Sequence, residues 1–118
     1  MTARRIEKPW GYELVWAETD RMVGKILHID EGHRLSLQFH RIKDEALLVQ
    51  SGVLELVLED DAGELQTTVM KPGDSVRIAP GRRHRMRAVE TCDVVEVSTP
   101  ELDDVVRLSD DYGRTGDA

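Results

Sequence analysis

Four side chains that carry metal-binding atoms are spaced so that they can meet in the folded chain. Gln38 and His40 are two residues apart in a stretch of strict polar–apolar alternation, so in a β-strand their side chains leave the same face. Glu45 comes after a short charged turn and can point back at that face, and His84 follows a second turn. Imidazole nitrogens and carboxylate oxygens bind divalent cations, and since no sulfur accompanies them, zinc, manganese, iron, nickel and cobalt are all admissible. We therefore expect one divalent metal ion bound by Gln38, His40, Glu45 and His84.

The face opposite these ligands is apolar, which reverses the usual pattern of a strand that faces water. Leu35, Leu37 and Phe39 occupy that face, and we expect them to project outward from the wall of a barrel. Soluble monomers rarely leave such a strip exposed. The N-terminal arm around Ile6 to Trp16 can cover it, either within one chain or as an exchanged strand. We therefore predict a homodimer with two-fold symmetry.

Short apolar runs separated by Gly, Pro and Asp turns make up most of the chain. They predict strands over residues 12–17, 22–29, 35–40, 46–50, 53–58, 65–70, 75–78, 84–89 and 94–98. We expect a short helical turn over Asp103–Leu108. The pattern favours an all-β jelly-roll barrel, a single domain of 118 residues with an N-terminal arm and strand over 1–20 and a frayed tail over 113–118.

The composition disfavours several classes of partner and site. The net charge is −7, from 16 basic and 23 acidic residues, so we expect no nucleic-acid partner; only the basic island Arg82–Arg87 could meet a small anion. Cys92 is the single cysteine, which excludes an internal disulfide and a cysteine metal cluster. No apolar run has the length of a signal peptide or a membrane span, so we expect a cytoplasmic protein with no membrane partner.

Two motifs resemble those of the cupins. Their first motif is a glycine, five residues, His-x-His, three or four residues, a glutamate, six residues and a glycine. Gly32, Gln38-Phe39-His40, Glu45 and Gly52 have this spacing, with Gln38 in place of the first histidine. The second motif is matched by Gly73, Ala79-Pro80-Gly81 and His84, with the proline displaced by one position and Ala88 in place of the family's asparagine. The resemblance implies a cupin β-barrel with a metal site at the four ligand positions.

Other segments resemble the cupin domain of type II mannose-6-phosphate isomerases, which in bifunctional members follows a GDP-mannose pyrophosphorylase. These segments span nearly the whole chain: Glu7–Tyr12, Leu35–Gln38, Glu96–Pro100, Asp103–Arg107 and Asp111–Arg114. Phosphomannose isomerases use a Gln, His, Glu, His zinc set, which implies that Gln38 is a ligand and that zinc is the metal. The family's stretch His-His-Arg-Ala-Glu-His-Trp is replaced here by the residues from His40 to Leu47. The ligand positions are kept, but the additional histidines and the tryptophan are not.

The resemblance implies aldose–ketose isomerisation of a small phosphorylated sugar through a cis-enediolate. A base must then reach a carbon-bound proton, and Glu96 and Lys25 are both candidates, on strands expected to line the barrel. Arg87, Arg107 and Arg114 are candidates to hold the phosphate. Two alternatives stay open. An Fe(II)-dependent oxygenase also uses two histidines and a carboxylate, and a non-catalytic sugar-binding cupin would explain the missing histidines.

Overall fold

The computed structural model describes residues 1–117 and contains ten β-strands. The strands are β1 (Arg4–Lys8), β2 (Gly11–Glu18), β3 (Val23–Ile29), β4 (Leu37–Phe39), β5 (Glu45–Glu59), β6 (Leu65–Met70), β7 (Ser75–Ile78), β8 (His84–Ser98), β9 (Val106–Ser109) and β10 (Gly116–Asp117). No helix in these residues is long and apolar enough to cross a membrane. The predicted all-β class is confirmed.

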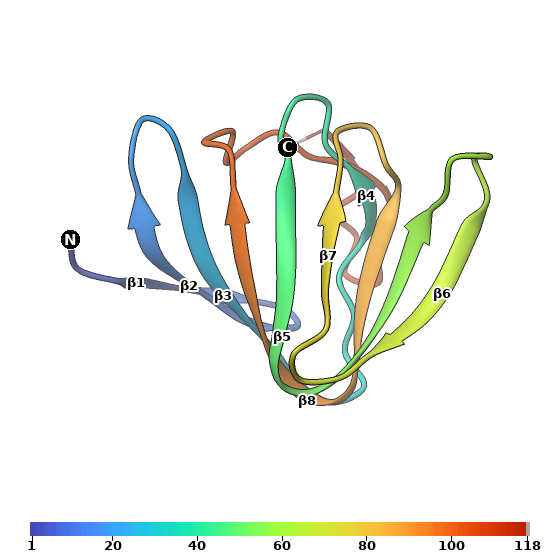
Figure 1. Cartoon of the computed structure of the whole chain (residues 1–118), viewed down its shortest axis with the longest axis horizontal. Coiled ribbons are helices and arrows are strands. Elements are labelled where there is room, and N and C mark those ends of the chain that lie inside the picture. Colours follow the sequence, from blue (N-terminus) through green and yellow to red (C-terminus); the bar gives the residue numbers. More distant parts are fainter. Residues whose placement is uncertain (118) are drawn as a thin grey trace.

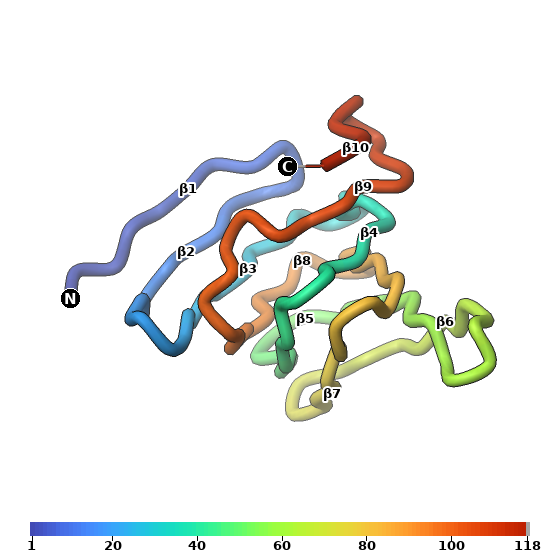
Figure 2. The backbone as a smooth tube through the Cα atoms, turned by 90° about the horizontal axis from the view of Figure 1, so that it is seen from above, coloured from blue at the N-terminus to red at the C-terminus, as the bar shows by residue number. Residues whose placement is uncertain are grey.

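All strand pairs are antiparallel and belong to one curled sheet. The strand order is β1-β2-β3-β8-β4-β9-β10, and β5 pairs with β8 along one edge and with β6 and β7 along the other. The strands rise from a narrow base and spread into an open cup (Figure 1). Seen from above, β1 and β2 run along one side of the cup and β6 and β7 lie at the other (Figure 2). The sheet thus encloses an interior that is open at one end.

The two longest strands, β5 and β8, each join two runs that the sequence predicts as separate strands. The pairing of β5 with β8 shifts register around Ser51, which marks a β-bulge. The segment that the sequence suggests is a turn is therefore a bend within one continuous pair of strands. Gly52 has a φ of +79°, and a Cβ there would lie 2.2 Å from the carbonyl oxygen of Thr91. Only glycine fits this bend. The two strands run antiparallel, so Glu45 pairs with Ser98 and His84 pairs with Leu58. The first residue of β5 and the first residue of β8 therefore lie at opposite ends of one ladder.

The predicted helical turn over Asp103–Leu108 is wrong. Val106–Ser109 form β9, which pairs with β4 through Phe39 and Val106. The open edge of β4 needs a hydrogen-bonding partner, and the β-branched Val106 suits a strand. Within the segment predicted to fray, β10 pairs with β9. Ala118 lies outside the described residues.

The expectation that Leu35 projects outward is also wrong. Leu35 is 7% exposed and belongs to the hydrophobic core, because the chain at 35–36 precedes β4 and does not keep the alternation of a strand. Leu37 and Phe39 are half-buried. β1 pairs with β2 of the same chain, so the N-terminal arm forms a hairpin. The strip that motivated the homodimer is thus not an exposed one, and the dimer stays a prediction for sedimentation to check.

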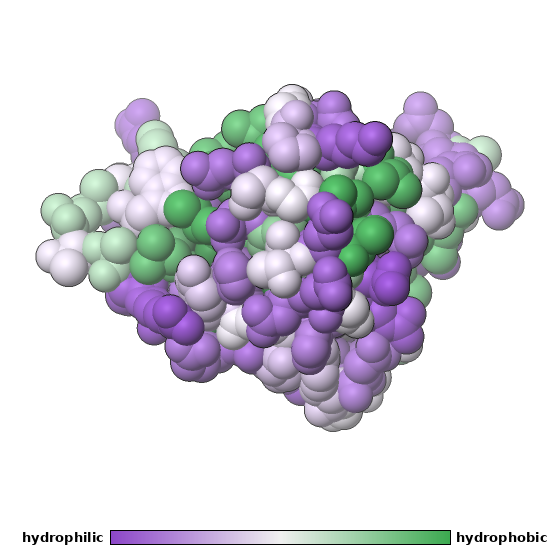
Figure 3. Space-filling model, turned by 90° about the horizontal axis from the view of Figure 1, so that it is seen from below, coloured by the Kyte–Doolittle hydropathy of each residue, from purple (hydrophilic) through white to green (hydrophobic). Residues whose placement is uncertain are grey.

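The face of the molecule seen from below carries many hydrophilic side chains with apolar areas between them (Figure 3). Trp16, Leu48 and Val97 are among the large apolar side chains that remain exposed. The core itself consists of aliphatic side chains with Trp10, Met70, Met86 and Cys92. Burial of this apolar set is the main favourable term that holds the curled sheet together.

Candidate metal centre and its cavity

Three of the four predicted ligands come together inside the cup. His40 directly follows β4, Glu45 begins β5 and His84 begins β8. One ligand atom from each of these residues lies within 4.8 Å of the others, and all three side chains are buried. Glu45 Oε1 lies 3.4 Å from His84 Nε2 and 3.7 Å from His40 Nε2. Two imidazoles and one carboxylate therefore converge on one point.

Both imidazoles are turned by hydrogen bonds so that their Nε2 atoms face that point. His40 Nδ1 donates to the backbone carbonyl of Asp104 at 2.5 Å, and His84 Nδ1 donates to that of Arg82 at 2.9 Å. A proton on each Nδ1 leaves a free lone pair on each Nε2, which is how proteins orient histidines that bind metals. Neither Nε2 atom nor Glu45 Oε1 has a hydrogen-bond partner among the described residues. Buried polar atoms are rarely left unsatisfied, so this group fits a bound metal ion.

The charges at the centre also favour a cation. Burial by itself raises the pKa of the Glu45 carboxyl, but the adjacent His40 imidazole and the Lys43 ammonium outweigh it and hold the pKa well below its usual range. Burial lowers the pKa of His84, against the attraction of Glu45. A carboxylate that stays ionised and an imidazole that stays neutral are the protonation states that metal binding requires.

Gln38, the fourth predicted ligand, lies in β4 with its Cα opposite that of His84. Its side chain lines the cavity, and its Oε1 accepts a hydrogen bond from Ser36 Oγ at 2.7 Å. A carbonyl oxygen has two lone pairs, so this bond leaves one of them free. Gln38 as a ligand stays a prediction.

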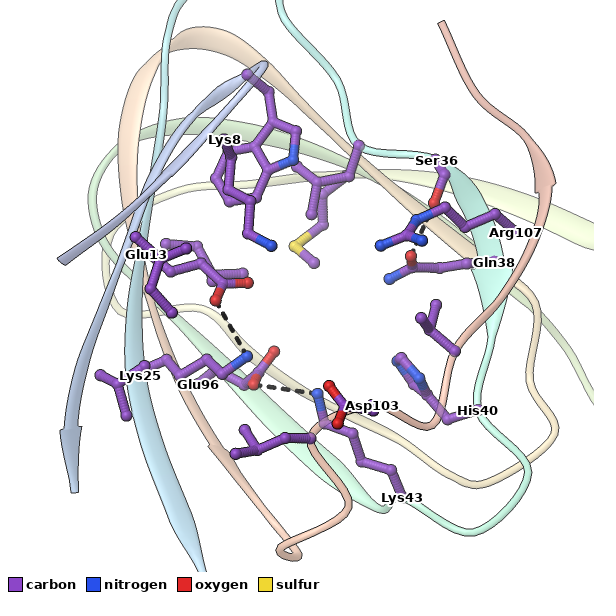
Figure 4. Close-up of a pocket in the computed structure, with 18 of the residues that line it drawn as sticks. Lys8, Glu13, Lys25, Ser36, Gln38, His40, Lys43, Glu96, Asp103 and Arg107 are labelled. Atoms are coloured by element: carbon purple, nitrogen blue, oxygen red, sulfur yellow. Dashed lines mark hydrogen bonds and ion pairs between the residues drawn. The ribbon is translucent and has the colours of Figure 1, made fainter. Parts of the chain in front are cut away.

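A cavity of about 240 Å³ opens beside the centre, lined by residues from β1, β2, β3, β4, β8 and β9. Both candidate bases, Glu96 and Lys25, lie in its wall (Figure 4). They are directly opposite each other on neighbouring strands β8 and β3, which explains why their side chains share a face. Both are buried.

Two separate groups of ion pairs lie at the cavity, and two of their members were not expected from the sequence. Lys25 Nζ lies 3.3 Å from Glu13 Oε2, and Lys43 Nζ lies 3.1 Å from Glu45 Oε2 and 3.3 Å from Glu96 Oε2. Glu13 and Lys43 are the additional residues. Lys43 looks like part of a charged turn, but it stands two residues before Glu45, and in an extended chain that spacing places both side chains on one face.

Glu96 has the properties of an acid–base group. Its burial, and next the negative charge of Glu45, raise its pKa to about 7, although Lys43 and Lys25 act in the opposite direction. Burial lowers the pKa of Lys43, but Glu96 and Glu45 outweigh burial and leave that pKa above its ordinary value. A carboxyl group that titrates near neutral pH can accept or release a proton at working pH.

The three candidate arginines have different surroundings. Arg107 and Arg114 both line the cavity. Arg114 is held by Asp110, whose two oxygens lie 3.0 Å from its Nε and Nη2. Arg87 does not reach the cavity: its neighbours Met86 and Ala88 point inward, and it lies 3.7 Å from Glu55 on the outside of the cup. The structure thus brings two of the three to the cavity.

Comparison with known proteins identifies the family. The model of the cupin domain matches residues 25–98, which is more than half of the chain. The chain is 30% identical over 117 residues to the xanthan biosynthesis protein XanB of Xanthomonas campestris and 31% identical over 117 residues to the mannose-1-phosphate guanylyltransferase of Escherichia coli K12. These alignments cover 95% and 94% of this chain but only 24% and 23% of the relatives, so the chain spans about a quarter of their length.

Solved structures agree in fold. KdgF from Halomonas sp. superposes with a TM-score of 0.71 at 23% identity, covering 87% of this chain and 91% of that one. Oxalate decarboxylase from Bacillus subtilis at pH 4.6 superposes with a TM-score of 0.77 at 14% identity, covering 90% of this chain and 30% of that one. With the family match over residues 25–98 and the histidine–glutamate cluster at the motif positions, the chain belongs to the cupin domain family.

Proposed function

We propose that this cupin is a metal-dependent aldose–ketose isomerase that acts on a phosphorylated sugar, in the manner of mannose-6-phosphate isomerases. One observation carries the proposal: the buried group of His40, Glu45 and His84 lies beside a cavity that holds Glu96, a carboxyl group with a pKa of about 7. The names of two relatives, a mannose-1-phosphate guanylyltransferase and a xanthan biosynthesis protein, support a role in sugar metabolism.

The reaction moves one proton between two adjacent carbons and a second proton from the hydroxyl oxygen to the carbonyl oxygen beside it, and the chain offers groups for the transfer between the carbons and for the negative charge on the oxygens. His40, Glu45 and His84, with Gln38, would hold a divalent ion, for which zinc is our first choice. Such an ion acts as a Lewis acid that stabilises negative charge on the sugar oxygens. Glu96 removes the proton from one carbon and returns it to the next. Lys43 holds Glu96 in place, because its ammonium bridges Glu96 and Glu45.

Lys25 remains a second candidate for the base, since it lies beside Glu96 in the same wall. Its ammonium is paired with Glu13 at 3.3 Å, however, and a base needs a free lone pair. We therefore assign the proton transfer to Glu96 and the positioning of the Glu13 carboxylate to Lys25.

The grouping of two histidines and one carboxylate also supports a second candidate, an Fe(II)-dependent oxygenase. Oxygen uptake that requires Fe(II) would favour it. Binding of a sugar phosphate without turnover, at any metal, would favour a sugar-binding cupin instead.

The decisive experiment combines metal analysis with a turnover assay. The purified chain is analysed for bound metal, reloaded separately with zinc, manganese, iron, nickel and cobalt, and incubated with mannose 6-phosphate. We expect fructose 6-phosphate to form with the wild type and with His33→Ala, an exposed histidine outside the centre. His84→Ala should abolish it. Absence of product at every metal would reject the isomerase.

A further inference from the structure

The cavity is basic although the protein is acidic. Six lysine or arginine side chains line it against three aspartate or glutamate side chains, whereas the whole chain has 16 basic and 23 acidic residues. A concave wall of one sign concentrates ligands of the opposite sign. The lining therefore selects for an anionic ligand.

Four of these six cations are neutralised within the chain. They form ion pairs with carboxylates, namely Arg4 with Glu18, Lys25 with Glu13, Lys43 with Glu45 and Glu96, and Arg114 with Asp110. The remaining two, Lys8 and Arg107, form no ion pair with any residue in the described range 1–117. These two cations are available to a ligand.

Arg107 is in addition incompletely satisfied. It lies in β9 with its Cα opposite that of Gln38, and its guanidinium points into the cavity beside Gln38 and Ser36 (Figure 4). Its Nε atom is buried without a hydrogen-bond partner among residues 1–117. A buried donor on a charged group is costly when unpaired, and a planar guanidinium is suited to an oxyanion. Arg107 therefore lacks the partner that its surroundings require.

Lys8 faces the same space from the opposite wall. In β1, the side chains of Arg4, Ile6 and Lys8 alternate toward the cavity. Figure 4 shows Lys8 and Arg107 across the cavity from each other, with His40, Lys43 and Glu96 together at the other end. The cavity thus has a cationic end and, apart from it, an end with the candidate metal centre and base.

We propose that Lys8 and Arg107 together bind the anionic group of a ligand whose other end reaches the centre of His40, Glu45 and His84. A phosphate monoester carries a charge of about −1.5 to −2 near neutral pH, which matches two unpaired cations better than the single charge of a carboxylate. The inference rests on the proposed function, because it assigns the phosphate end of the same ligand. Of the three arginines that are candidates to hold the phosphate, the inference assigns this role to Arg107, and it adds Lys8 as a second phosphate-binding residue.

Binding measurements on the full chain test the inference without turnover. Calorimetric titration with mannose 6-phosphate, glucuronate and mannose is carried out on the wild type, Lys8→Gln, Arg107→Gln and Arg107→Lys. Arg21→Gln, which removes an exposed cation outside the cavity lining, is the matched control. We expect Lys8→Gln and Arg107→Gln each to weaken mannose 6-phosphate binding at least tenfold and mannose binding less than twofold. Arg21→Gln should bind as the wild type does.

The outcomes separate this inference from the isomerase proposal. Phosphate-dependent binding that needs Lys8 and Arg107, without isomerisation, would support the inference and reject the isomerase. A tenfold loss seen only with glucuronate would identify a carboxylate as the anion. Arg107→Lys keeps the charge, so partial retention of binding supports an electrostatic role if Arg107→Gln proves unstable. If no anion binds the wild type, or if neither glutamine variant weakens it, the inference is overturned.

Discussion

Lys43 Nζ lies 3.1 Å from Glu45 Oε2, on the side of the carboxylate that faces away from the two histidines. The other oxygen, Oε1, is the one that lies near His40 Nε2 and His84 Nε2. The two oxygens of the Glu45 carboxylate therefore have different partners. Oε1 is free for a metal ion, whereas Oε2 is engaged by a buried ammonium, so Glu45 can serve as a ligand through a single oxygen.

This division makes Lys43→Met an informative variant. The buried ammonium repels a divalent cation and competes for Glu45, so we expect its removal to tighten zinc binding about tenfold. The same change leaves the buried carboxylates Glu45 and Glu96 without their shared cation, which destabilises the metal-free protein. Chelator competition measures the affinity and thermal unfolding measures the stability. Weaker zinc binding with unchanged stability would contradict this view of Lys43.

The ligand assignment predicts a graded response in metal content. Replacing His40 and His84 together by Ala should abolish tight zinc binding, whereas Gln38→Ala should weaken it less, because a neutral amide is a poorer ligand. His33→Ala is the matched control. Zinc stoichiometry after dialysis is the measurement, and a double histidine variant that still carries one zinc per chain would refute the site.

The raised pKa of Glu96 predicts how the stability of the metal-free protein depends on pH. Its ordinary value is 4.5, and in the folded chain it is about 7, so the folded state holds this proton more tightly than the unfolded state does. Glu96 therefore favours folding below pH 4.5, and this contribution is lost as the pH rises through about 7. Urea unfolding between these limits should show a weaker pH dependence for Glu96→Gln than for the wild type.

The same residue predicts the pH profile of turnover. A base must be unprotonated, so we expect isomerisation to rise with pH through the pKa of Glu96. Glu96→Gln should lose about 10²- to 10⁴-fold in kcat while still binding mannose 6-phosphate. A Glu96→Gln enzyme with wild-type kcat and an unchanged profile would transfer the role of base to another group.

The hydrogen bonds of Asp104 hold the segment that carries two of the candidate metal ligands. Its carboxylate accepts hydrogen bonds from the backbone N–H groups of Arg41, Ile42 and Lys43 at 3.1, 2.7 and 2.9 Å, and its backbone carbonyl orients His40. Asp104→Ala should cost about 1–3 kcal/mol of stability, because three charge-assisted bonds are lost. It should also weaken zinc binding, since the segment between the ligands His40 and Glu45 is loosened. Asp20→Ala, which removes an exposed carboxylate outside the cavity lining, is the control.

The sequence was informative where chemistry depends on local spacing. The spacing from glycines and turns predicts a ligand group that includes His40, Glu45 and His84. In the structure these three side chains do converge on one point. Lys43 was missed because a lysine between two charged residues looks solvated; only the folded sheet shows that it faces Glu96. The strand β9 was missed for a similar reason. Val106 forms a strand because β4 offers it an edge, and that edge is distant in the sequence.

Leu35 shows a different limit. Alternation from Leu35 to His40 predicts one continuous strand, but β4 begins at Leu37, and both Leu35 and Ser36 are buried. A pattern of side chains gives the face of a residue only where the backbone is extended. The register shift between Leu37 and Gln38 against β9 marks where the pattern starts to hold.

The pairing of β5 with β8 implies that a metal ion at the centre would also stabilise the fold. Glu45 and His84 belong to opposite ends of that ladder, and Glu45 is 13 residues from Leu58, the partner of His84. In a flat ladder this distance would be roughly 43 Å, yet the two side chains lie 3.4 Å apart. An ion held between them would act as a removable cross-link that ties the two ends of one bent ribbon into a ring. Releasing the ion would remove this cross-link while the backbone pairing of β5 with β8 remains, so we expect the metal-free protein to stay folded but to unfold at a lower temperature than the metal-bound protein.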